Sequence, residues 1–358
     1  MSAPADRPVG VLPRMAPGAW GAPLAPLYGF GVALRHWAFD LGLLRSVHAG
    51  VPTVSVGGLE AGGSGKTPVT GFVLRALRSA GRAPGLLTRG YGRGHAELRL
   101  RRAGEAPRVV DLGDEATMLV SQGIDVPVAA VPRRRLGAQT LVELGCDCLV
   151  LDDGFSHRAL ARDVDIVVVR AEAPHGKARM LPWGTLREPL ASLSRAHLVW
   201  WQTKTLQAPQ SVPERLRELA PKAQWVHGRL RPAGVWGRAG EPLDVRVGRW
   251  LAATGIAWPE DFFARLQADG VTLLETWRYA DHHAFSAADA AHLCERCQAL
   301  GADGVVVTDK DAVKLLPLWP QDAPELARQS VRVEVVSGAP ALALALGIPV
   351  SALVDPSG

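Results

Sequence analysis

Cysteine is scarce in this sequence, with four residues among 358. So few thiols cannot form a disulfide framework, and we therefore expect a reducing compartment. Apolar residues are plentiful at 47%, while charged residues make up 21%. The composition excludes an intrinsically disordered chain and a small disulfide-stabilised domain, and the length favours two domains.

Lysine is also scarce, because only six of the 40 basic residues are lysines, and 35 acidic residues leave a net charge of +5. An arginine-rich surplus of this size suits phosphates or lipid headgroups, and it is too small to indicate nucleic acid. We expect neither a nucleic-acid partner nor an obligate protein partner.

A clean membrane-spanning run is absent. The twenty uncharged residues between Arg14 and Arg35 approach the spanning length, but prolines and glycines interrupt them. Apolar residues then recur at steps of three and four, which places them on one helix face: Leu27, Phe30, Leu34, Trp37, Leu41 and Leu44. This amphipathic helix, in an N-terminal segment 1–46, either packs on its own domain or lies in a membrane interface.

Strands and helices alternate along the rest of the chain. Short apolar runs predict strands at residues 51–56, 84–88, 126–130, 148–151, 164–169 and 198–201. Helical patterns separate several of them, at residues 66–79, 114–122 and 134–144. This alternation predicts an α/β fold over residues 47–228, with a mostly parallel sheet and helices on both faces.

A second alternating set follows a stretch rich in Gly, Pro and Arg at residues 229–249. Its predicted elements are strand 250–253, helix 259–268, strand 272–277, helix 286–300 and strand 304–308. We therefore predict a smaller C-terminal α/β domain over residues 229–358.

A glycine-rich turn joins the first predicted strand to the first predicted helix, and it reads Gly62-Gly63-Ser64-Gly65-Lys66-Thr67. Glycines let backbone N–H groups turn toward phosphate oxygens, and the helix N-terminus favours an anion. In such a P-loop, Lys66 reaches the β- and γ-phosphates of ATP and the Thr67 hydroxyl ligates Mg²⁺. Glu60 stands where the Walker pattern has its first glycine. We predict a P-loop NTPase-like domain.

Acidic residues stand at two further positions. Asp152 and Asp153 follow the buried strand 148–151, and at the carboxyl edge of a parallel sheet such carboxylates hold Mg²⁺. Asp114 and Glu115 begin a predicted helix, where acidic side chains often do no more than complement the helix dipole. The other interpretation makes Asp114 a general base.

Seven blocks in this order and spacing resemble the tetraacyldisaccharide 4′-kinases of lipid A biosynthesis. They are residues 54–68, 88–92, 113–115, 151–155, 181–189, 281–283 and 308–314. The P-loop of that family also lacks the first Walker glycine. The resemblance implies phosphoryl transfer from ATP, with Mg²⁺, to the 4′-hydroxyl of an acylated glucosamine disaccharide 1-phosphate in lipopolysaccharide biosynthesis.

The resemblance also implies roles for residues. Asp114 is the expected catalytic base, His282 its partner, and Lys66 the cation on the phosphates. A carboxylate that takes the hydroxyl proton improves a poor nucleophile. Because Asp114 and His282 fall in different predicted domains, we expect domain closure to bring them together. The N-terminal helix is expected to dock the protein, as a peripheral protein, on the cytoplasmic face of the inner membrane.

Further residues are predicted to contact the substrate or its phosphate, namely Arg89, Glu115, Arg134, His157 and Arg187. Guanidinium groups bind phosphate through paired hydrogen bonds. The run of arginines around Arg134 fits a solvated surface equally well. Besides Glu60, where the family usually has Ser or Thr, three residues depart from the usual family pattern: Ser156 in place of Gln, Lys177 in place of Asn, and Arg170 in place of an acidic residue.

Other functions fit some of these residues. The paired cysteines are spaced like zinc ligands, but they lie in apolar segments that favour packing over metal binding. A P-loop regulatory ATPase or GTPase acting at the membrane surface stays open as the second interpretation. A non-enzymatic surface protein with a vestigial loop is disfavoured because Lys66, Thr67 and Asp152 are all present.

Overall fold

The computed structural model describes residues 18–353, except residues 92, 94, 174–177 and 205–210. The start of the expected N-terminal segment and Lys177 therefore lie outside the described residues. The chain forms two compact units. The P-loop unit comprises the described residues up to Leu230 and those from Val333 onward. Residues 231–332 form the other unit, which we call the second unit.

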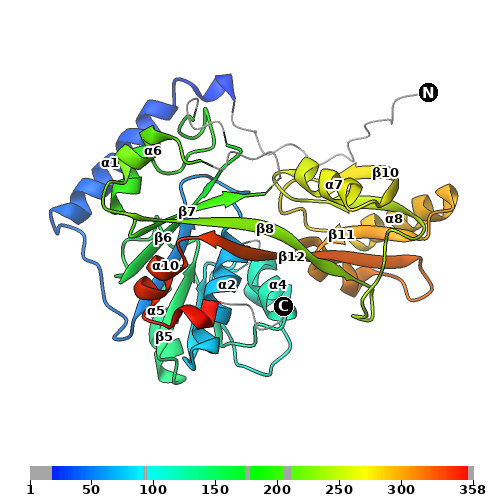
Figure 1. Ribbon diagram of the computed structural model, residues 1–358, viewed down its shortest axis with the longest axis horizontal. Helices are drawn as coiled ribbons and strands as arrows, with labels where there is room; N and C mark the ends of the chain where they lie inside the picture. The colour runs from blue at the N-terminus through cyan, green and yellow to red at the C-terminus, as the bar shows by residue number, and fades with distance from the viewer. Residues whose placement is uncertain (1–17, 92, 94, 174–177, 205–210, 354–358) are drawn as a thin grey trace. The chain divides into compact units, whose positions relative to one another are not determined.

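The division differs from the expected domain 229–358 at its end, because the chain returns to the P-loop unit after Arg332. Gly338 shows this return: it has a φ of +85°, and a Cβ there would lie 2.5 Å from the backbone oxygen of Trp225. Two long strands, β8 (Gln224–Trp236) and β12 (Glu325–Ser337), each have residues in both units (Figure 1). The stretch 229–249, expected to be a junction, thus begins inside a strand.

The P-loop unit is an α/β fold. Its strands pair in the order β8-β7-β6-β1-β5-β2-β4-β3, and every pair is parallel except β3 with β4. Its strands besides β8 are β1 (Thr53–Gly58), β2 (Pro84–Thr88), β3 (Arg99–Arg101), β4 (Val128–Ala130), β5 (Cys148–Asp152), β6 (Val164–Arg170) and β7 (Leu198–Thr203). Strands β1, β2, β4, β5, β6 and β7 are buried along their whole length, as expected of a sheet covered on both faces.

Helices connect and cover these strands. They are α1 (Ala25–Asp40), α2 (Lys66–Ser79), α3 (Val109–Leu112), α4 (Asp114–Ser121), α5 (Arg134–Glu143), α6 (Glu214–Leu219) and α10 (Ala339–Leu346). Short 3₁₀ turns, η1 (Ala19–Gly21), η3 (Leu190–Arg195) and η5 (Val350–Leu353), complete the unit. The predicted fold class, a mostly parallel sheet with helices on both faces, is confirmed.

The second unit has the strand order β10-β9-β11-β12, and all its pairs are parallel. Its other elements are β9 (Arg249–Thr254), α7 (Pro259–Ala268), β10 (Thr272–Arg278), α8 (Ala287–Leu300), β11 (Gly304–Thr308), α9 (Asp309–Leu315) and η4 (Leu316–Leu318). Helix α8 begins at a capping box, in which Ser286 and Asp289 each bond the other's backbone. This local signal explains why its start was predicted well from sequence.

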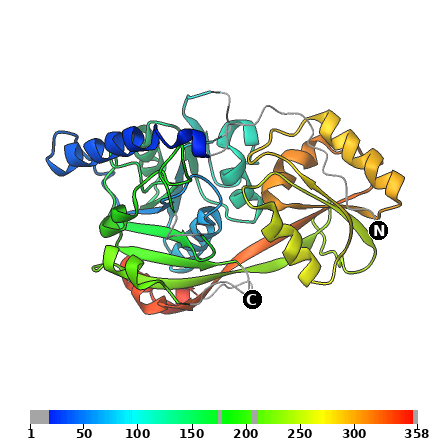
Figure 2. The same cartoon turned by 90° about the horizontal axis from the view of Figure 1, so that it is seen from above.

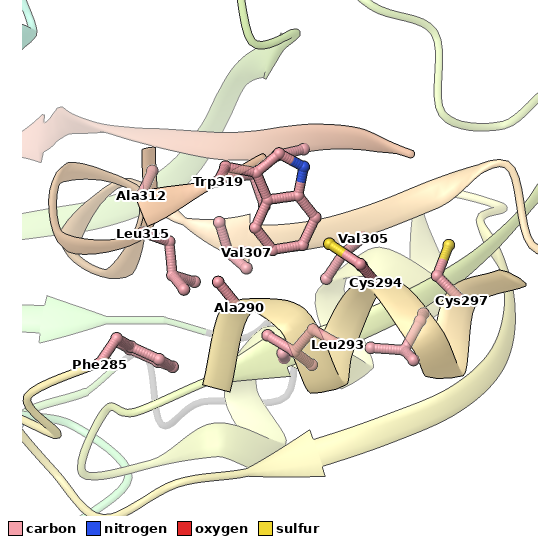
Figure 3. Close-up of a cluster of buried hydrophobic side chains, with 13 residues drawn as sticks. Phe285, Ala290, Leu293, Cys294, Cys297, Val305, Val307, Ala312, Leu315 and Trp319 are labelled. Carbon is pink, nitrogen blue, oxygen red and sulfur yellow. The ribbon is translucent and has the colours of Figure 1, made fainter. Parts of the chain in front are cut away.

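The cysteines are free and buried. Cys294 and Cys297 lie one turn apart on α8 and pack with Leu293, Val305 and Trp319 in the apolar core of the second unit (Figure 3). Burial raises the pKa of the Cys297 thiol to about 11, which keeps it protonated at neutral pH. These two thiols therefore behave as small core residues.

Helix α1 lies along the outside of the P-loop unit (Figure 2). The predicted apolar stripe points away from the protein: Leu27 is 70% exposed, Phe30 66% and Trp37 54%. The interpretation in which this stripe packs on its own domain is therefore wrong. The helix also ends at Asp40, before Leu44 of the predicted stripe.

The opposite face of α1 attaches to the P-loop unit through polar contacts. His36 Nε2 lies 2.6 Å from the carboxylate of the buried Glu188, and Arg158 donates to Asp40 at 2.6 Å. Arg35 donates to the backbone oxygen of Ser156 at 2.9 Å. The helix is thus held largely by charged and polar groups, which leaves Leu27, Phe30 and Trp37 in solvent. In the described part of the chain, no helix combines the length and the apolar character needed to cross a membrane.

Candidate active site

The candidate site forms where β1 and β5 end. These strands are adjacent and parallel, and Val56 of β1 lies opposite Asp152 of β5. The P-loop follows β1 directly, while Asp153 follows β5. Parallel pairing therefore brings the phosphate-binding loop and the two carboxylates to one edge of the sheet, as the motifs predicted.

The P-loop has the backbone conformation that its glycines allow. Gly62, Gly63 and Gly65 have φ values of +82°, +64° and +84°, which residues with a Cβ rarely adopt. Gly65 is the N-cap of α2, so the helix begins at Lys66. Residues 62–67 thus combine a left-handed glycine turn with a helix N-terminus, which is the geometry that accepts phosphate.

Lys66 is held at the mouth of this loop. Its Nζ donates to the Ser64 hydroxyl at 3.4 Å and lies 3.5 Å from Asp153 Oδ1. The motif did not reveal a second lysine: Lys204, directly after β7, donates through Nζ to the backbone oxygen of Gly63. The available signal was a lysine directly after the predicted strand that became β7. Because no motif accompanies that strand, the sequence offered no reason to connect Lys204 with the P-loop.

Asp153 pairs with Arg187 as well as with Lys66. Both Arg187 terminal nitrogens donate to the Asp153 carboxylate, each at 2.6 Å. Burial disfavours the charged carboxylate, but Lys66, Arg187 and Arg134 outweigh it and hold the pKa of Asp153 well below its usual range. Each Asp153 oxygen already accepts a hydrogen bond from Arg187, which makes Asp153 the less favourable of the two predicted carboxylate ligands of a metal.

Asp152 is the better-placed oxygen donor. It is 3% exposed, and its Oδ1 accepts a hydrogen bond of 2.8 Å from Thr70, one turn beyond Thr67 on α2. Burial, together with the nearby charges of Glu115 and Asp153, raises the pKa of Asp152 to about 7 against the opposing effects of Thr70 and Lys66. Concentrated negative charge of this kind fits a cation, so the residues present are compatible with Mg²⁺ held by Thr67 and Asp152.

Asp114 begins α4, and it is 5% exposed. The N-cap position belongs to Gly113, so Asp114 is not the capping residue; its carboxylate accepts from the N–H of Glu115 at 2.9 Å. Gly113 has a φ of +83°, and a Cβ there would lie 2.6 Å from the backbone oxygen of Tyr91. Close approach of Gly90 and Tyr91 therefore requires glycine at position 113, directly before α4.

His282 belongs to the second unit. It follows β10 in a loop, with a φ of +59° and a side chain 15% exposed. Its Nε2 lies 3.0 Å from Lys310 Nζ and 4.0 Å from Asp281 Oδ1. The predicted base and its predicted partner thus stand in separate compact units.

Arg134 has a role other than the one expected. It is 3% exposed, and its guanidinium donates to the backbone oxygens of Leu87 and Asp152 at 2.9–3.2 Å. Burial lowers the pKa of Arg134 to about 10, although Asp153 and Asp152 oppose that effect. The structure gives no support to the predicted contact with a substrate phosphate, because the guanidinium already bonds backbone oxygens of β2 and β5. Its neighbours Arg133 and Arg135 are exposed.

Arg89 and His157 are close enough to interact electrostatically. Arg89 is exposed, and its charge helps to lower the pKa of both Arg134 and His157. Burial is the larger cause for His157 and, together with nearby arginines, lowers the pKa of that imidazole to about 4. The His157 ring therefore stays neutral in the folded protein at neutral pH.

A pH dependence of stability follows from His157. Between about pH 6.5 and pH 4 the imidazole of His157 is protonated in the unfolded chain and neutral in the folded protein. Because the unfolded state then binds the extra proton, the free energy of unfolding falls as the pH drops through this window. We expect His157→Gln to remove on the order of 1 kcal/mol of that decrease, since part of the ring is exposed. Urea unfolding at about pH 7 and pH 5 measures it.

A matched control for this measurement is His48→Gln, at an exposed histidine. That variant should keep the decrease seen for the unmodified protein. If His157→Gln also keeps it, the buried neutral imidazole is not a source of the pH dependence.

The glycine-rich loop, its lysine and the carboxylate at the end of β5 define the site as that of a P-loop nucleotide-binding protein. A model of the family described as Tetraacyldisaccharide-1-P 4′-kinase matches residues 18–346. The chain belongs to this family.

Individual relatives agree with the family. A tetraacyldisaccharide 4′-kinase of Anaeromyxobacter sp. (strain K) is 39% identical over 351 residues, covering 94% of this chain and 92% of the relative. One from Xanthomonas axonopodis pv. citri (strain 306) is 38% identical over 299 residues, covering 82% and 83%. The predicted resemblance is confirmed, and the kinase is supported over the P-loop regulatory switch.

A solved structure shares the fold. LpxK from Aquifex aeolicus, described as an "apo" form in complex with ATP, aligns with a TM-score of 0.73. The alignment covers 91% of this chain and 96% of that one, at 23% sequence identity.

Proposed function

We propose that the protein transfers the γ-phosphoryl group of ATP to the 4′-hydroxyl of a tetraacyldisaccharide 1-phosphate. The observation that carries the proposal is the P-loop, with Lys66 paired to Asp153 at the end of β5, in a chain that belongs to this kinase family. The backbone N–H groups of residues 62–67 and the Lys66 ammonium bind the β- and γ-phosphates.

Phosphoryl transfer needs an activated hydroxyl. The 4′-oxygen forms a bond to the γ-phosphorus, the bond from that phosphorus to the β–γ bridging oxygen breaks, and ADP leaves. Asp114 takes the hydroxyl proton, with His282 as the partner that orients its carboxylate. The proposal therefore requires these two residues to meet during turnover.

The proposed metal is Mg²⁺, with Thr67 and Asp152 as its protein ligands. Bound there, it would neutralise charge on the β- and γ-phosphates. Asp153 acts instead through Lys66 and Arg187, whose positive ends it holds beside the loop. Arg89, Glu115, His157 and Arg187 stay predictions as substrate contacts.

A direct assay tests the proposal. Purified protein, ATP, Mg²⁺ and detergent-dispersed tetraacyldisaccharide 1-phosphate should yield ADP and a product with one additional phosphate, detected by mass spectrometry. Omitting the lipid should leave ATP intact. If protein that binds ATP forms no phosphorylated lipid, the proposal is wrong, and ATP hydrolysis without transfer would favour the regulatory switch.

We further propose that α1 lies in the membrane interface on the cytoplasmic face of the inner membrane, where an acylated substrate is anchored. The support is the exposed apolar stripe, in which Leu27, Phe30, Leu34 and Trp37 are all more than half exposed. Burial of such side chains in a lipid surface stabilises binding, and aromatic rings suit the headgroup region.

Replacing Phe30 and Trp37 together by serine should weaken binding to anionic vesicles roughly tenfold or more, because two exposed aromatic contacts are lost. The fold should persist, since both side chains already lie in solvent. Vesicle co-sedimentation measures the change. Leu344→Ser removes an 84% exposed leucine elsewhere on the P-loop unit and should have no effect; equal binding by both variants would exclude the docking role of α1.

A further inference from the structure

The backbone of His282 has an unusual conformation. Among the described residues, two that are not glycine have a positive φ, Asp153 at +50° and His282 at +59°. Non-glycine residues enter this region only when their surroundings hold them there, and such residues gather at functional sites. Asp153 has Lys66 and Arg187 around it. The groups that hold His282 come from the block 308–314, to which no role has been given above.

Asp311 of that block anchors the loop that carries His282. The carboxylate is fully buried, and it accepts hydrogen bonds from the hydroxyls of Thr254 and Thr308 at 2.7 Å and from the N–H of Gly255 at 3.0 Å. The backbone oxygen of Gly255 in turn accepts from the N–H of His282 at 3.1 Å. A chain of two bonds therefore links Asp311 to the backbone of His282.

Lys314 holds the next residue. One turn along α9 from Asp311, its Nζ lies 3.1 Å from Asp311 Oδ1 and donates to the backbone oxygen of His283 at 3.0 Å. The N–H of His283 donates to the backbone oxygen of Ala280. The N–H of His282 and both backbone polar groups of His283 are thus bonded, which explains how the positive φ of His282 is maintained.

Lys310 acts on the ring itself. Its Nζ lies 3.0 Å from His282 Nε2 and 3.5 Å from Asp281 Oδ1. An ammonium group has donors and no acceptor, so Nε2 of His282 must supply a lone pair and the ring proton must lie on Nδ1. In that tautomer the imidazole presents an N–H at Nδ1, which is the donor that a partner of a carboxylate base needs.

We infer that Lys310 is a positioning residue that selects the Nδ1–H tautomer of His282, while Asp311 and Lys314 hold the loop that carries the ring. The inference rests on the proposed function, because positioning His282 matters for turnover only if His282 assists Asp114. Groups that orient a metal-binding histidine typically contribute 10–100-fold to activity, and we expect an effect of that order for His282. The block 308–314 is then part of the kinase machinery although it adjoins no P-loop residue in sequence.

A spectroscopic experiment tests the tautomer without any enzyme assay. Protein labelled with ¹⁵N-histidine gives distinct imidazole nitrogen shifts for a protonated and an unprotonated nitrogen, and comparison with His282→Gln assigns the signals. At a pH where the ring is neutral, we expect His282 to have a protonated Nδ1 in the unmodified protein. Lys310→Met should convert a measurable fraction to protonated Nε2, whereas Lys222→Met, at an exposed lysine, should change nothing. Protonated Nε2 in the unmodified protein overturns the inference.

A kinetic cycle tests the consequence. Lys310→Met should lower kcat roughly tenfold or more and leave the KM for ATP nearly unchanged. In a His282→Ala background the same substitution should have no further effect, because the group it positions is gone. Lys310→Arg, which keeps the charge and donors, should recover part of the rate.

The outcomes separate the two claims. No kinase activity in the unmodified protein would refute the proposed function and leave the tautomer experiment to decide the structural inference. An active protein in which Lys310→Met matches Lys222→Met, or in which the loss persists without His282, would refute the positioning role.

Discussion

Asp114→Asn should lower kcat roughly 10²–10⁴-fold, because an amide cannot take the proton from the 4′-hydroxyl. The affinity for ATP should change little, since Asp114 begins α4 and lies outside the P-loop. The substitution keeps the shape of the side chain, and its Oδ1 can still accept from the N–H of Glu115. Steady-state kinetics, together with equilibrium binding of ATP, measures the two effects separately.

Asp322→Asn is the matched control, at an exposed aspartate of the second unit, and it should leave both quantities unchanged. An equal loss of turnover and of ATP affinity in Asp114→Asn would contradict its role as the base, because a base acts after ATP has bound. Full turnover would contradict it more simply.

Lys66→Met is the second large expected effect. Removing the ammonium takes away the charge that meets the β- and γ-phosphates, and losing one such group typically costs about 10²–10³-fold in kcat. ATP binding should weaken as well, because the phosphates carry charge in the ground state. Asp153 keeps its two bonds from Arg187, so the end of β5 should stay ordered. Single-turnover transfer and ATP titration measure these losses.

Lys222→Met is the matched control, because it also replaces a lysine by methionine, at an exposed position. It should retain the unmodified rate and affinity. If Lys66→Met retained both, the P-loop assignment would fail, because no other described part of the chain carries a glycine-rich loop opening a helix after a buried strand.

The parts of the site predicted best from sequence are those with local causes. The turn at residues 62–67 depends on its glycines. Because the carboxyl ends of adjacent parallel strands lie at the same edge of a sheet, β5 places Asp152 beside the end of β1. The capping box at Ser286 likewise set the start of α8. The glycine turn and the capping box are each encoded by a few neighbouring residues, whereas the pairing of β1 with β5 joins distant segments.

Features that depend on long-range packing are not encoded in local sequence patterns. The stripe on α1 is the same whether it faces a core or a membrane, so only the structure excluded packing on the domain. Arg134 belongs to an arginine run, yet its side chain turns inward and donates to the backbone oxygens of Leu87 and Asp152. The links from Lys204 to the P-loop and from Lys310 to His282 join distant segments, which no local pattern records.

The central claim is transfer of the γ-phosphoryl group of ATP to one particular oxygen of the lipid. ATP carrying ³²P in the γ-position, incubated with tetraacyldisaccharide 1-phosphate, tests it when the position of the label in the product is mapped by chemical degradation and NMR. The account predicts label in a monoester at the 4′-oxygen and none in free phosphate beyond the level of a reaction without lipid. Label at another hydroxyl, or in free phosphate alone, would contradict it.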